Sequence, residues 1–92
     1  MTETEYALEG GEEYGEIVEI WESFGGDLWI LTEVDEGGNT GFGYARLSVS
    51  PQFAEWGRIH RAELVRNPKV WEVERKDWTN VDTYDGISLV EV

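Results

Sequence analysis

The chain has 92 residues, of which 40% are hydrophobic and 13% aromatic, and it carries a net charge of −13 and no cysteine. This length allows one domain, the aromatic content excludes a disordered acidic tail, and the lack of cysteine excludes disulfides, thiolate zinc sites and a cysteine nucleophile. No apolar run approaches the ~20 residues of a membrane span, and the first residues are acidic where a signal peptide is basic. We therefore expect one cytoplasmic domain over residues 1–92 that makes no contact with a membrane.

The first segment of the chain, residues 1–15, combines acidic side chains with three glycines. Such a composition buries little apolar surface by itself. Its main apolar side chains are Tyr6, Leu8 and Tyr14. We interpret residues 1–15 as a loosely held acidic arm that docks on the domain through Tyr6 and Leu8.

Residues 16–24 fit two kinds of secondary structure. Apolar residues at positions 17, 20, 21 and 24 have helical spacing, and Gly25 stands where such a helix would end. Against a helix, glutamates recur every three residues with no base between them, and the apolar residues are β-branched or aromatic. A hairpin turn at residues 25–27 also explains the glycines, so we favour a strand.

Short apolar runs between turn residues predict strands in the middle of the chain. Residues 28–34 form such a run, residues 35–40 form a flexible turn, and residues 41–47 return beside the first strand. Residues 53–59 alternate weakly and indicate another strand. Residues 61–66 predict a short helix that ends before the next proline.

Two further strands are predicted near the end of the chain, over residues 70–75 and 87–92, with a turn at Tyr84-Asp85-Gly86 between them. The sequence contains no internal repeat and no linker. Together the segments predict an α+β fold: a single small domain with a mostly antiparallel sheet of four to six strands and one or two short helices.

No group of residues forms a catalytic, metal or cofactor motif. Gly41-Phe42-Gly43-Tyr44 matches the core of an RNA-recognition octamer, but Thr40 stands where that motif has a base. The net charge opposes direct binding of nucleic acid, because phosphate contacts need a surplus of Lys and Arg. The single histidine, His60, belongs to no nucleophile motif. We expect a protein that is not an enzyme, uses no metal or other cofactor and does not bind nucleic acid directly.

From Ile17 to about Trp78 the order of features resembles a family of small domains of unknown function found on plasmids and other mobile elements. The matching segments are residues 29–35, Gly41-Phe42-Gly43-Tyr44, Glu55-Trp56-Gly57 and Ala62-Glu63-Leu64. The resemblance implies an α+β fold and a mobile-element context, and it carries no catalytic residue. In acidic character the chain is also similar to the DNA-mimic inhibitors that phages and plasmids use against restriction or CRISPR systems, although it shares no motif with them.

The acidic residues are unevenly distributed along the chain. Residues 1–45 hold twelve acids and no base, whereas residues 46–92 hold eight acids and all seven bases. Three explanations compete: a solubilising surface, adaptation to high salt, and a surface for a basic partner such as a nucleic-acid-binding protein. The nearly neutral second half fits a general adaptation to salt poorly.

Our main hypothesis is a non-enzymatic interaction protein whose acidic face occupies the basic groove of a DNA-binding protein. Carboxylates take the places of phosphates and contact Lys and Arg of the partner. A DNA-mimic inhibitor of a CRISPR or restriction component is its concrete form, located in the host cytoplasm if a phage encodes it. The residues assigned to partner binding are Glu12, Glu13, Glu16, Glu19, Glu22, Asp27, Asp35, Glu36 and Trp56.

The alternative hypothesis is an accessory domain whose acidity only keeps it soluble and which binds a protein through exposed aromatic residues. Trp56 and Trp78 stand beside charged residues and are the candidates, since aromatic residues dominate interface hot spots. Trp21, Trp29 and Trp71 fall within apolar strand patterns, which predicts that they belong to the core.

Overall fold

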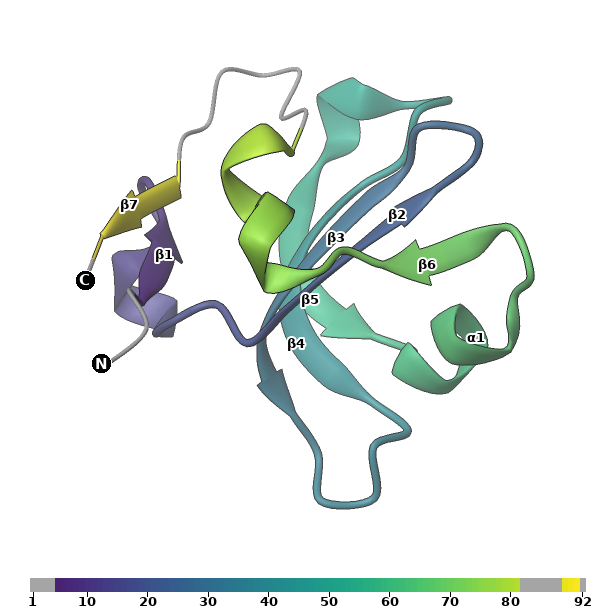
Figure 1. Cartoon of the computed structure of the whole chain (residues 1–92), viewed down its shortest axis with the longest axis horizontal. Coiled ribbons are helices and arrows are strands. Elements are labelled where there is room, and N and C mark those ends of the chain that lie inside the picture. Colours follow the sequence, from purple (N-terminus) through teal and green to yellow (C-terminus); the bar gives the residue numbers. More distant parts are fainter. Residues whose placement is uncertain (1–4, 82–88, 92) are drawn as a thin grey trace.

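A computed structural model of the chain describes residues 5–81 and 89–91. Within them, five antiparallel strands form the main sheet in the order β5-β4-β3-β2-β6, and β1 pairs with β7 in a separate two-stranded ribbon (Figure 1). The strands are β1 (Tyr6–Leu8), β2 (Glu19–Ser23), β3 (Leu28–Val34), β4 (Gly41–Arg46), β5 (Glu55–Ile59), β6 (Val70–Glu72) and β7 (Leu89–Glu91). The helices are one α-helix, α1 (Arg61–Arg66), and the 3-10 helices η1 (Glu12–Tyr14), η2 (Pro51–Phe53) and η3 (Arg75–Asn80). The predicted α+β fold with a mostly antiparallel sheet is confirmed.

The ambiguous segment after the arm is a strand. β2 pairs with β3 through the register Trp21↔Trp29, and the turn between them closes with a hydrogen bond from Ser23 N to Asp27 O of 3.1 Å. Gly26 has a φ of 93°, a conformation that side chains disfavour, so a glycine suits this turn. Glutamates three apart on a strand point to opposite faces, which removes the repulsion that opposed a helix.

The chain runs through β2, β3, β4 and β5 as consecutive antiparallel neighbours and then returns to the other edge of the sheet, where β6 pairs with β2. The connection of residues 60–69 contains α1, which packs against β6. Figure 1 shows α1 beside the ends of β5 and β6.

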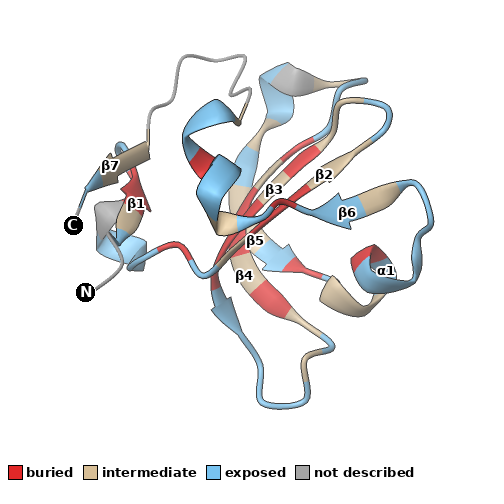
Figure 2. Cartoon of the chain, viewed as in Figure 1, coloured by how far each residue is buried: buried red, intermediate tan, exposed pale blue. Residues whose placement is uncertain are grey.

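Apolar residues fill both faces of the sheet, because successive strand residues point in opposite directions. One face, called here the η3 face, packs Ile20, Ile30 and Tyr44 against Leu8 and Trp78. The opposite face, called the α1 face, packs a smaller cluster of Trp21, Leu31, Ile59 and Leu64. Figure 2 shows the buried residues concentrated in the central strands.

The N-terminal arm is held more firmly than its composition suggested. β1 pairs antiparallel with β7, and both Ala7 and Leu8 are buried. Ile17 N also donates a hydrogen bond of 2.7 Å to Tyr6 O. The predicted turn at residues 84–86 lies outside the described residues. Among the helices that are described, none is long and apolar enough to span a membrane.

Candidate acidic binding groove

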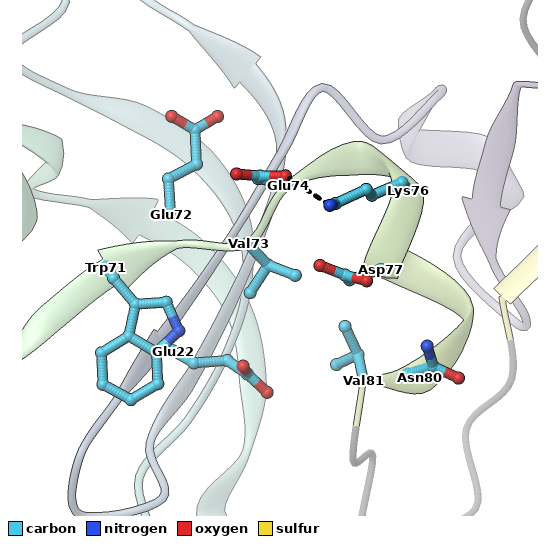
Figure 3. Close-up of a pocket in the computed structure, with 9 residues that line it drawn as sticks. All are labelled: Glu22, Trp71, Glu72, Val73, Glu74, Lys76, Asp77, Asn80 and Val81. Carbon is cyan, nitrogen blue, oxygen red and sulfur yellow. Dashed lines mark ion pairs between the residues drawn. The ribbon is translucent and has the colours of Figure 1, made fainter.

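A groove of about 420 Å³ opens on the η3 face between β2, β6 and η3 (Figure 3). Its lining combines one large aromatic ring, two valines and several carboxylates. The lining residues are Glu22, Trp71, Glu72, Val73, Glu74, Lys76, Asp77, Asn80 and Val81.

One wall of the groove is η3, which Trp78 fastens to the sheet. Trp78 is 3% exposed, and its Nε1 donates a hydrogen bond of 3.2 Å to Val73 O. The Tyr6 ring meets it edge-on at 6.4 Å, and the Arg75 guanidinium lies 4.6 Å from its ring centre. Trp78, which the sequence suggested as an interface residue, is thus a core residue that holds η3 against the sheet.

The floor of the groove is apolar. Trp71 lies opposite Glu22 in the β2–β6 pairing, and Val73 continues the pairing with a hydrogen bond of 2.7 Å from its N to Ile20 O. Trp71 and Val73 point to the same face, as their alternation predicts, but η3 covers only the valine. Trp71 remains 45% exposed, so the prediction that it belongs to the core is wrong.

The rim of the groove is acidic. The lining holds four carboxylates and a single base, Lys76, which lies 3.4 Å from Glu74 in an exposed ion pair. Figure 3 shows the carboxylates of Glu22 and Asp77 near the two valines, while that of Glu72 points away from them. The groove therefore has an electronegative rim over a half-exposed indole.

The carboxylate of Glu72 interacts with charged groups on the α1 face, Glu19 and Arg61. Burial raises its pKa, the negative charge of Glu19 raises it further, and the charge of Arg61 partly opposes both effects. This agrees with the register, which places Glu72 beside Trp21 on that face. Glu22, Glu74 and Asp77 are the carboxylates left to serve the groove.

The arrangement suits a positively charged ligand group. An ammonium or guanidinium group over an indole ring is attracted to the ring face, and neighbouring carboxylates add charge-assisted hydrogen bonds. Among the described residues, no cluster of three or more His, Cys, Asp or Glu side chains could hold a metal ion. The groove thus has the chemistry to attract a positively charged group.

No protein-family model matches the chain, and no curated protein or solved structure is significantly similar to it. The resemblance to a mobile-element domain family therefore stays a prediction from the sequence.

The structure does not gather the predicted acidic residues on one face. Glu13 and Glu16 are exposed near the N-terminal ribbon, where a hydrogen bond with Glu5 raises the pKa of Glu16. Asp35 and Glu36 lie in the turn after β3, at the far end of that strand from Asp27. The seven residues of β3 separate these two ends by about 23 Å. The Glu12 side chain is outside the described part of the structure.

Two other predicted residues are engaged within the fold. Glu19 accepts hydrogen bonds from Arg61 at 2.7 and 2.8 Å, so a nearby arginine neutralises it. Asp27 accepts hydrogen bonds from the Ser23 hydroxyl at 2.9 Å and from Ser48 N at 2.7 Å. Of the seven predicted acids whose side chains the structure describes, Glu22 alone lines the groove.

Trp56, the predicted aromatic contact, is partly buried and packs against the main core cluster. Its ring stacks on Tyr14 with centroids 4.3 Å apart and lies 5.9 Å from Tyr44. A Cβ atom added to Gly11 would lie 2.2 Å from this ring, which shows how closely the N-terminal segment covers it. The sequence did not point to Trp71, Glu74 and Asp77 as groove residues, because the charge imbalance lies in residues 1–45.

Proposed function

We propose that this chain is a non-enzymatic binding protein that takes cationic side chains of a basic partner protein into the acidic groove. The observation that carries the proposal is that the half-exposed Trp71 ring and the carboxylates of Glu22 and Asp77 line one groove (Figure 3). A cation on such a ring gains about 0.5–2 kcal/mol, depending on how far it is desolvated. Carboxylates around it speed association and fix orientation.

The charge over the rest of the surface supports a basic partner. Among the described residues, thirteen acids and four bases are exposed. The exposed acids are Glu5, Glu9, Glu13, Glu16, Glu33, Asp35, Glu36, Glu55, Glu63, Glu72, Glu74, Asp77 and Glu91, and the exposed bases are Arg58, Arg66, Lys69 and Lys76. Such an imbalance steers a basic surface toward the chain from a distance, with a rate that falls as salt rises.

The narrower form of the proposal is an inhibitor that blocks the basic groove of a nucleic-acid-binding protein, such as a CRISPR or restriction component. Its support is the overall surface charge together with the groove. The face predicted from the early glutamates and aspartates gives the proposal no support. Those residues are divided between both faces of the sheet and both ends of β3. The partner-binding assignment accordingly moves to Glu22, Trp71, Glu74 and Asp77.

The test uses a short peptide of alternating arginine and glycine, with a citrulline counterpart that keeps the shape and removes the charge. We expect the arginine peptide alone to bind by calorimetry, with affinity falling between about 50 and about 300 mM NaCl. The variant E22Q/D77N should weaken binding at least about tenfold. The control E33Q/E36Q removes the same charge at exposed positions away from the groove and should change affinity less than about threefold.

Three results discriminate the alternatives. Equal weakening by both double variants would mean that net charge alone acts, which contradicts a groove. Loss of binding on Trp71→Ala with no effect of E22Q/D77N would favour the accessory-domain hypothesis, in which aromatic residues make the contact. For the inhibitor form, the chain should displace a labelled duplex from its purified target, and E22Q/D77N should fail to do so.

A further inference from the structure

One end of the sheet is formed by two loops that contact each other: the turn between β2 and β3, residues 24–27, and the connection between β4 and β5, residues 47–54. Asp27 joins them, because its Oδ1 accepts a hydrogen bond of 2.7 Å from Ser48 N and its Oδ2 one of 2.9 Å from the Ser23 hydroxyl. The two loops therefore lie at the same end of the sheet (Figure 1, top).

This surface carries large apolar side chains that nothing in the described chain covers. Phe24 is 87% exposed, Val49 88% and Phe53 72%, and Leu47 is also exposed. Hydrogen bonds from Ser50 N to Leu47 O and from Phe53 N to Ser50 O close tight turns, so the exposure follows from an ordered backbone. We call these four residues (Phe24, Leu47, Val49 and Phe53) the apolar end.

The apolar end differs from the rest of the surface in charge as well. Residues 47–54 contain no charged residue, and neither do residues 23–26. The carboxylate of Asp27, the one ionisable group in these two loops, has both oxygens occupied by hydrogen bonds. In a molecule with a net charge of −13, these two loops thus carry a single carboxylate, that of Asp27, which is hydrogen-bonded to the loops themselves.

We propose that the apolar end is a contact between two copies of this chain, which associate end to end. Two copies repel one another wherever carboxylates face each other, so the approach that costs least free energy is through this end. With molecular extents of 33 × 31 × 23 Å, end-to-end contact keeps the two centres about 30 Å apart. That distance exceeds the Debye length of about 8 Å at physiological salt, so the remaining repulsion is largely screened.

The size of the surface predicts a weak dimer. Two nearly uncovered phenylalanines, a valine and a leucine offer on the order of 500 Å² of apolar surface on each copy. A symmetric contact then buries about 1,000 Å² in total, at the lower end of specific interfaces. We expect a dissociation constant of roughly 10–100 µM.

Sedimentation equilibrium of the full chain tests the dimer. The mass should rise from monomer toward dimer as concentration increases to about 500 µM, and more completely at about 500 mM than at about 50 mM NaCl. The variant V49S/F53S should remain monomeric, and Phe24→Ser should weaken association at least about tenfold. Near-UV circular dichroism confirms that each variant keeps its fold.

The matched control is Val65→Ser, which removes an exposed valine from α1, and it should dimerise as the parent chain does. E22Q/D77N should also dimerise normally, because the apolar end does not depend on the groove. A parent chain that stays monomeric at about 500 µM in high salt overturns the proposal. So does equal loss of dimer in Val65→Ser, or a dimer that persists in folded V49S/F53S.

Discussion

The guanidinium of Arg61 binds the carboxylate of Glu19 through two hydrogen bonds, Nε to Oε1 at 2.7 Å and Nη2 to Oε2 at 2.8 Å. The same arginine donates from Nη1 to Gly38 O at 3.0 Å, and Trp21 Nε1 donates to Glu19 Oε1 at 2.9 Å. These contacts connect α1, β2 and the turn after β3. An acidic residue that the charge pattern assigned to a partner therefore has a structural role.

We expect Arg61→Ala to lower the free energy of unfolding by about 1–3 kcal/mol, because it leaves a partly buried carboxylate without its bidentate partner. Urea denaturation at pH 7 measures the loss. Arg66→Ala, at the exposed end of the same helix, is the control and should change stability by less than about 0.5 kcal/mol. Equal effects of the two variants would show that the ion pair contributes nothing specific.

The pH dependence of stability should reflect two neighbouring carboxylates of opposite behaviour. Burial raises the pKa of Glu19, but the hydrogen bonds from Arg61 and Trp21 and the charge of Arg61 outweigh it, so its pKa lies below 4.5. The stability that Glu19 contributes to the folded state is therefore present above pH 4.5 and is lost as pH falls through its folded-state pKa. Glu72 has a raised pKa, so its contribution is present below pH 4.5 and is lost as pH rises through the folded-state pKa.

Glu72→Gln should accordingly stabilise the protein at pH 7, by about 0.3–0.5 kcal/mol after allowance for solvent screening. The gain should shrink as pH falls toward 4, where Glu72 itself becomes protonated. Chemical denaturation at several pH values measures both quantities. Glu33→Gln removes the same charge from an exposed position on β3 and should show no such pH-dependent gain.

Local patterns predicted most of the secondary structure, because each signal lay within a few residues. The apolar run at 28–34 coincides with β3, and residues 61–66 form α1, which ends before Pro68. Residues 70–75 were predicted as a strand, and residues 70–72 form β6, but the prediction that Trp71 is buried was wrong while Val73 is buried. Which of them η3 covers depends on where residues 75–80 pack, and no local pattern contains that information.

The candidate site was less predictable for the same reason. Grouping acids by position along the chain assumed that neighbours in sequence share a surface. The alternation of strand residues separates Glu19 from Glu22, while the crossover to β6 brings Glu22 beside Trp71. Pairing between strands some fifty residues apart decided the composition of the groove.

The motif at residues 41–44 is explained by packing. A Cβ atom added to Gly43 would lie 2.0 Å from Ile30 O and 2.7 Å from Leu31 Cα, both in the backbone of the adjacent strand. We expect Gly43→Ala to destabilise the protein by about 2–4 kcal/mol. Gly57→Ala on β5 adds a methyl group with no atom within 4 Å and should change stability by less than about 1 kcal/mol. Thermal unfolding of the pair makes the comparison, and a tolerated alanine at position 43 would contradict the close strand approach.

Substitutions of Trp56, which packs against the core, and of Trp71, which is half-exposed in the groove, should affect stability and binding differently. Trp56 stacks on Tyr14 and lies 6.2 Å from Phe42, so Trp56→Ala should lower the free energy of unfolding by about 2–4 kcal/mol. Below its unfolding transition, this variant should bind the arginine peptide as the parent chain does. Trp71→Ala should reverse the pattern, with a stability loss below about 1 kcal/mol and at least about tenfold weaker binding. Urea denaturation and calorimetry on both variants provide the measurements.

If folded Trp56→Ala loses peptide binding while Trp71→Ala keeps it, the contact surface lies at the N-terminal segment, and the groove is not the binding site.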